Sequence, residues 1–131
     1  MSFSETDPLE DQMGVRCEDM TADQLVTYLK DWQEAVNNTV MRLDGKEIYP
    51  IRWLQKVYGD DAGLIVKWLC YKHRGKDDRG YLITHRMFCT KMKWWIDLMY
   101  AEMQQQLARE NRREAAAVTG SGNWTGFATS L

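Results

Sequence analysis

The amino-acid sequence predicts an all-α fold: a small bundle of about four helices, with a long projecting C-terminal helix and flexible tails. In the first two predicted helices, apolar residues share a face at the spacing of an amphipathic helix. The stretch from Thr84 to Val118 contains neither proline nor glycine, which favours one continuous helix. A chain of 131 residues, 44% of them hydrophobic, is long enough to bury a single core.

The N-terminal third predicts a flexible arm followed by one well-marked helix. Residues 1–20 are polar and acidic, a composition typical of a mobile segment. The next helix begins after Thr21, because Thr21 and Gln24 have the spacing of a reciprocal N-terminal cap. Its apolar face repeats as Leu25, Leu29, Trp32, Val36 and Val40. This face predicts a helix of about 19 residues.

Two more helices are predicted before the long one. Asp44-Gly45-Lys46 is typical of a turn, and the second helix should run from Pro50 to Gly59. The third should begin after Asp60 as its cap and end at residues 72–75. Its apolar residues lie almost all round, so we expect it to be the most buried helix. Residues 75–83 predict a loop that is locally extended near its end.

The long helix divides into an apolar first half and a polar second half. We therefore place the helical core domain at 21–103 and a projecting helix arm at 104–118. Along the arm, like charges stand four residues apart and repel each other, so they do not stabilise the helix. An ordered helix here would therefore need a partner to hold it. Residues 119–131 predict a flexible tail with apolar anchors. The predicted protein interface consists of Met99, Met103, Leu107, Trp124, Phe127 and Leu131.

Charge is distributed unevenly along the chain, although the net charge is only −2. Residues 1–23 are acidic, and residues 67–93 are basic with interleaved aromatic residues. Lysine and arginine neutralise phosphates and aromatic rings stack on bases, so this segment fits a nucleic acid or an acidic protein surface. A solvated face and an intrachain contact with residues 1–23 are the alternatives. The basic residues are Lys67, Lys72, Arg74, Lys76, Arg79, Arg86, Lys91 and Lys93.

One spacing pattern predicts a metal site. Cys70 and His73 end the third helix, and His85 and Cys89 lie in the first turns of the long helix. A helical hairpin would bring two thiolates and two imidazoles together, a set suited to a closed, structural zinc site. The alternative is ordinary burial of the cysteines and ordinary positions for both histidines at helix ends. No other cofactor is predicted.

These features favour a non-enzymatic interaction or assembly protein, oligomeric or a subunit of a larger complex. No recognised catalytic motif and no apolar run of membrane-spanning length is present, so we expect no enzyme activity, small-molecule substrate or membrane partner. The odd number of cysteines and the acidic N-terminal segment fit a cytoplasmic protein. The small size and the apolar anchors at the C-terminal end fit a component of an intracellular or virion assembly, including that of a phage. The alternative function is a small nucleic-acid-binding protein that uses residues 67–93.

Overall fold

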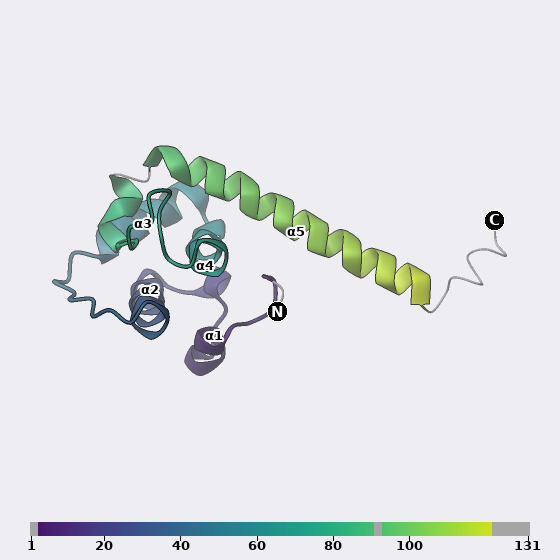
Figure 1. Ribbon diagram of the computed structural model, residues 1–131, viewed down its shortest axis with the longest axis horizontal. Coiled ribbons are helices and arrows are strands. Elements are labelled where there is room, and N and C mark those ends of the chain that lie inside the picture. The colour runs from purple at the N-terminus through teal and green to yellow at the C-terminus, as the bar shows by residue number, and fades with distance from the viewer. Residues whose placement is uncertain (1–2, 91–92, 122–131) are drawn as a thin grey trace.

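The computed structural model describes residues 3–90 and 93–121, with side chains at 94–116 in the second range. Its elements are α1 (Pro8–Met13), η1 (Cys17–Asp19), α2 (Ala22–Val36), α3 (Ile48–Tyr58), α4 (Asp61–His73), η2 (His85–Cys89) and α5 (Lys93–Ser121), where η is a short 3-10 helix. The described ranges contain no strand, apart from an isolated bridge between Lys76 and Leu82. The predicted all-α fold is confirmed, with α5 running across the other helices and beyond them (Figure 1).

The N-terminal segment is folded, which corrects the predicted flexible arm. Asp7 caps α1 by accepting a hydrogen bond from the backbone nitrogen of Glu10 at 2.8 Å. Phe3 is fully buried and packs edge-on against Trp68, with ring centroids 5.0 Å apart. The acidic composition concealed this packing, because the buried acids Asp7 and Glu10 have partners inside the protein.

α2 begins as predicted and ends earlier. Thr21 Oγ1 accepts a hydrogen bond from Gln24 nitrogen at 3.2 Å, and Gln24 Oε1 accepts one from Thr21 nitrogen at 2.9 Å, so the capping box is confirmed. The helix ends at Val36 because Asn38 takes a left-handed conformation. Residues 39–44 then run without regular structure, so Val40 is exposed rather than part of the predicted apolar face.

α4 is the most buried helix, as its sequence predicts. Its buried positions run from Ala62 to Cys70 with a single break at Leu64. A β-carbon at Gly63 would stand 1.8 Å from the carbonyl oxygen of Cys17, so glycine permits η1 to lie directly against this helix. The predicted cap at Asp60 is wrong in one respect, since its side chain makes no capping hydrogen bond.

The long helix starts later than predicted, at Lys93 rather than Thr84. Residues 85–89 form η2 instead, in which His85 and Phe88 are buried. His85 Nε2 lies 2.9 Å from the carbonyl oxygen of Val26. This contact with α2 was not expected from the predicted continuous helix. Tertiary contacts therefore override the local helical pattern in this stretch.

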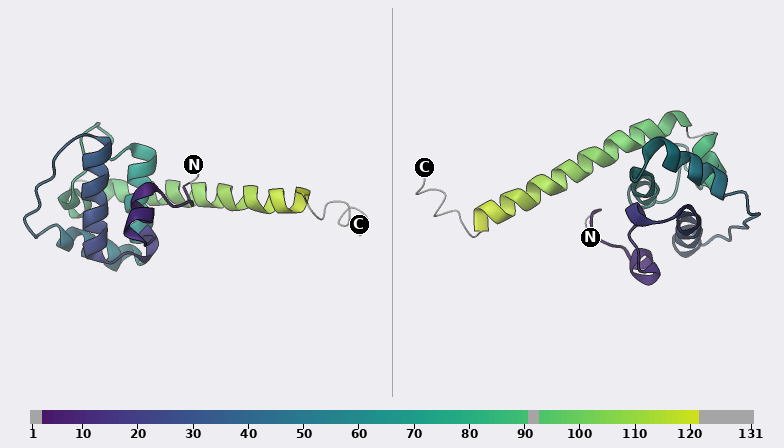
Figure 2. Two further views of the ribbon diagram at one scale, coloured as in Figure 1. Left: turned by 90° about the horizontal axis from the view of Figure 1, so that it is seen from below. Right: turned by 180° about the vertical axis from the view of Figure 1, so that it is seen from behind.

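α5 is packed along its first part and uncovered along its second. Trp95, Ile96, Met99 and Met103 are buried against the rest of the protein. Among the described side chains of this helix, the last buried position is Glu110, and every residue from 111 to 116 is exposed. Figure 2 shows this far end extending away from the group formed by the other helices. The projecting segment predicted at 104–118 therefore begins at 111.

Candidate functional site

The clearest candidate for a binding surface is the face formed by residues 75–90 and Trp94, and a buried glutamine positions it. Gln33 on α2 is fully buried, and its Nε2 donates hydrogen bonds to the carbonyl oxygens of Gly75 at 2.7 Å and Ile83 at 3.0 Å. Ile83 nitrogen also donates to the Gly75 carbonyl oxygen at 2.8 Å. These bonds close the base of the 75–83 loop, so the loop has a fixed position on the protein.

The tip of this loop is organised by Asp77 and presents an aromatic ring to solvent. Asp77 Oδ1 accepts hydrogen bonds from the backbone nitrogens of Arg79 and Tyr81, each at 2.9 Å. Asp77 nitrogen donates to the carbonyl oxygen of Tyr81 at 2.9 Å. Tyr81 is 67% exposed as a result. Exposed aromatic side chains on an ordered loop are typical of a contact surface.

A groove of about 630 Å³ separates this loop from the start of α5. Tyr81 and Trp94 stand on its walls, and Trp94 is 64% exposed. Its lining consists of Asp77, Asp78, Arg79, Tyr81, Leu82, Thr84, Arg86, Met87, Thr90 and Trp94. Its volume lies in the range of roughly 300–1,000 Å³ typical of ligand pockets. We refer to it as the Trp94 groove.

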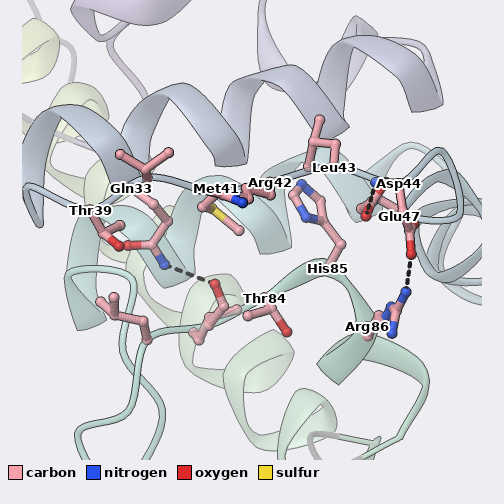
Figure 3. A pocket seen from close by; sticks show the side chains of 13 residues that line it. Gln33, Thr39, Met41, Arg42, Leu43, Asp44, Glu47, Thr84, His85 and Arg86 are labelled. Carbon is pink, nitrogen blue, oxygen red and sulfur yellow. Dashed lines mark hydrogen bonds and ion pairs between the residues drawn. The ribbon is translucent and has the colours of Figure 1, made fainter.

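A second cavity, of about 430 Å³, lies on the other side of residues 82–86. Residues 39–44 form its opposite wall, and Gln33, Glu47 and His85 contribute to its lining (Figure 3). Burial lowers the pKa of His85, while the Val26 carbonyl oxygen and the charge of Glu47 oppose this effect. His85 is therefore neutral near pH 7 and acts as a structural contact in this wall.

Arg86 links the two cavities. It lines both of them, and its guanidinium forms an ion pair with Asp44, seen at the right of Figure 3. Glu47 fixes the same turn, because its carboxylate accepts hydrogen bonds from the backbone nitrogens of Asp44 and Gly45. Several polar contacts thus hold the backbone of the candidate face in place, while its aromatic residues remain uncovered within the described structure.

The predicted basic segment divides into buried, exposed and undescribed members. Lys67 is only 2% exposed in its side chain and forms an ion pair with Glu10 at 2.7 Å, so it is not available to a partner. The exposed members are Lys72, Arg74, Lys76, Arg79 and Arg86. Lys91 and the side chain of Lys93 lie outside the described residues.

In the described part of the chain, Glu10–Lys67 is the one ion pair that joins the acidic segment to the basic segment. Burial alone would raise the pKa of Glu10, but hydrogen bonds from Lys67 and from the backbone nitrogens of Cys17 and Asp7 lower it below its ordinary value. Lys67 Nζ also donates to the carbonyl oxygen of Glu5 at 2.7 Å. The acidic segment therefore folds onto α4 through this lysine and leaves the exposed basic residues uncovered by ion pairs, except Arg86.

The four predicted zinc ligands do not form a common site. The described residues, which include all four, hold no group of three or more potential ligands around one point. Cys70 is buried, and Cys89 Sγ lies 3.7 Å from the carbonyl oxygen of Arg86. His73 Nε2 lies 2.8 Å from Glu102 Oε1 on α5, while His85 contacts α2. The predicted hairpin does not form, because residues 85–89 pack against α3 rather than beside α4. The geometry therefore gives the zinc hypothesis no support.

The predicted protein interface is also divided. Met99 and Met103 are buried within their own chain, and Leu107 is partly buried against the same core. Their burial corrects the prediction that this stripe is free to contact a partner. Trp124, Phe127 and Leu131 lie outside the described residues.

Neither the residues that hold α5 in place nor the exposure of Trp94 was predicted from the sequence. Glu102 accepts a hydrogen bond from Trp68 Nε1 at 2.8 Å, and Glu110 accepts hydrogen bonds from the N-terminal segment. No local pattern marks either acid. The exposure of Trp94 could have been predicted from the sequence. Trp95, Met99 and Met103 share one buried helical face, and Trp94 does not lie on that face.

Comparison with protein-family models, with curated proteins and with solved structures found no match to this chain. None of the described helices has the length and apolar composition required to cross a bilayer.

Proposed function

We propose that this protein is a non-enzymatic interaction and assembly module that contacts its partners through the far end of α5 and the residues after it. The observation that carries this proposal is the uncovered end of α5. The helix has 29 residues and spans about 43 Å, yet Glu110 is the last buried residue among its side chains described up to residue 116. A helix of which one end packs on its own core offers the other end to a second molecule.

The latch at Glu110 supports the proposal, because it fixes the direction in which the far end leaves the core. The Glu110 carboxylate accepts hydrogen bonds from the backbone nitrogens of Phe3 at 3.2 Å and Ser4 at 3.1 Å. It also accepts one from Ser4 Oγ at 2.6 Å and one from Gln106 Nε2 at 2.8 Å. The final turns of α5 therefore extend from a fixed point.

The end of the packed region determines where a test truncation should be made. Removal of residues 104–131 would delete the partly buried Leu107 and the Glu110 latch, so it would disturb the core as well as the projecting end. A chain that ends after Glu110 keeps both. We expect this shorter chain to retain the circular dichroism melting temperature of the full chain and to lose association in sedimentation velocity experiments. A full chain that remains monomeric at all concentrations, or a shortened chain that associates equally well, would contradict the proposal.

The second candidate function is nucleic-acid binding through the exposed part of the basic segment. Lys72, Arg74, Lys76 and Arg79 are all exposed and lie within ten residues of the exposed ring of Tyr81. Basic side chains beside an aromatic ring suit the backbone and bases of a single strand. Asp77 and Asp78 weaken this surface, since they stand between the basic residues along the chain.

Salt dependence separates the two functions. Binding of a labelled single-stranded oligonucleotide by the basic residues should weaken steeply between 50 and 200 mM salt, as expected when counterions are released from phosphates. It should also persist in the chain that ends after Glu110. A Lys76→Ala/Arg79→Ala variant that binds the oligonucleotide as the unchanged protein does would rule out this second function.

A further inference from the structure

We propose that the Trp94 groove receives Trp124 and Phe127 from a second copy of the chain, so that copies join head to tail. This inference rests on the proposed function, because it names the surface through which assembly occurs. The groove forms the head, and the residues beyond Ser121 form the tail.

The groove has the chemistry of a receptor for aromatic side chains. Tyr81 and Trp94 present exposed rings, and Leu82 and Met87 add apolar side chains to the lining. Aromatic rings pack favourably in edge-on or offset arrangements, and methionine adapts to irregular surfaces. The charged residues at the rim are of both signs, so the groove does not select a strongly charged ligand.

The tail supplies matching side chains in a segment without charge. Residues 119–131 contain no lysine, arginine, aspartate or glutamate, and they include one tryptophan and one phenylalanine. Glycine occupies positions 120, 122 and 126, which leaves room for the backbone to approach a partner closely. A segment of this composition gains binding energy from its aromatic residues and gains little from the charges that attract nucleic acids.

The geometry of α5 excludes the same contact within one copy. From Trp94 to Ser121 the helix advances about 40 Å, at 1.5 Å per residue. Trp124 and Phe127 are three and six residues beyond Ser121, so even a fully extended chain carries them at most about 10 and 20 Å from the helix end. Neither aromatic residue reaches the groove of its own copy. α5 therefore acts as a spacer that reserves the tail for another molecule.

A contact of this kind joins two different surfaces and is heterologous. Each copy then has one free groove and one free tail, so assembly proceeds to a closed ring or to an open chain of copies. This property makes the inference testable by complementation. A copy with a damaged groove still has a working tail, and a copy with a damaged tail still has a working groove.

The experiment compares two full-length variants, Trp94→Ala and Trp124→Ala/Phe127→Ala, alone and mixed in equal amounts. Native mass spectrometry and sedimentation velocity measure their assembly in 0.1 and 0.5 M salt. Each variant alone should associate at least about tenfold more weakly than the unchanged protein, as expected for the loss of an aromatic anchor. The mixture should form a one-to-one heterodimer that does not grow further, and higher salt should not weaken it.

Two controls keep the result specific. Tyr49→Ala removes another aromatic residue, 64% exposed like Trp94 but outside the groove, and it should associate as the unchanged protein does. Tyr81→Ala damages the opposite wall of the groove and replaces Trp94→Ala if that variant fails to fold.

The outcomes distinguish this inference from the broader proposal. Association that survives both variants but disappears when the chain ends after Glu110 overturns the head-to-tail contact and leaves the assembly function standing. A mixture that forms no heterodimer also overturns the contact. Loss of oligonucleotide binding in Trp94→Ala, with association unchanged, overturns it in favour of nucleic-acid binding. A full chain that remains monomeric overturns the contact and the assembly function together.

Discussion

The two parts of α5 differ in what surrounds them, although they belong to one helix. From Trp95 to Glu110, one face of the helix contacts α4, η2 and the N-terminal segment. From 111 to 116, no side chain is buried. A helix can therefore continue without packing, because the helical hydrogen bonds of α5 continue beyond the last buried side chain.

Two glutamates show this difference most clearly. Glu110 and Glu114 are one helical turn apart and carry the same charge. Glu110 is 7% exposed and receives four hydrogen bonds, while Glu114 is exposed. The repulsion expected between them is therefore offset by donors from the other end of the chain, which sequence spacing does not reveal. The boundary of the packed region is set by that long-range contact.

The largest expected effect is on the stability of the packed part. Met103→Ala removes a buried side chain and should lower the free energy of unfolding by about 2–5 kcal/mol, through lost burial and a residual cavity. Leu98→Ala, an exposed apolar position on the same helix, should change it by less than about 1 kcal/mol. Urea denaturation of both variants measures the contrast. Equal losses would mean that the two faces of α5 are not distinguished as described.

The latch should give an intermediate effect. Glu110→Ala leaves the N-terminal donors of Phe3 and Ser4 without their acceptor and should cost about 1–3 kcal/mol. Glu114→Ala, the matched change one turn later, should lie within about 0.5 kcal/mol of the unchanged protein. Thermal denaturation of the two variants provides the measurement. A neutral Glu110→Ala would show that the N-terminal segment does not depend on α5.

The smallest expected effect is the dependence of stability on pH, which belongs to the packed region alone. The pKa of His85 is lowered in the folded protein, mainly by burial, so the unfolded chain binds a proton more readily. Stability should therefore fall as pH drops below about 6.5. Glu10 also has a lowered pKa, so its contribution is present above about 4.5 and is lost at more acid pH.

This pH dependence is measured by urea denaturation between pH 7.5 and 4. The chain that ends after Glu110 should show the same profile as the full chain, because both titrating groups lie in the part that it retains. Stability that rises between pH 7 and 5 would show that the environment of His85 is not as described.

Much of the fold was predictable because local signals were strong. The capping box at Thr21 and the apolar surface of α4 each act within one helix, and both were identified correctly. The N-terminal segment and residues 84–90 were not predicted, since their conformations depend on distant partners. Lys67 buries Glu10, and Val26 holds His85. Composition alone indicated an arm in the first case and a helix in the second.

The candidate site was predictable only in part. The aromatic and basic content of residues 67–93 pointed to the region that contains the Trp94 groove, but Lys67 and Trp68 proved to be core residues. The groove depends on Gln33, which is 42 positions away from Gly75 in the sequence. Spacing within a segment identifies side chains with suitable chemistry, and it does not show which of them face solvent.

α5 is covered by its own chain up to Glu110 and exposed at 111–116, and the central claim is our proposal that copies associate through its far end. Hydrogen–deuterium exchange measured over a series of protein concentrations tests this claim most directly. We expect the amides of 95–110 to be protected at every concentration, and those of 111–121 to be protected only where association occurs. Protection of 111–121 equal to that of 95–110 in the dilute monomer would contradict the account.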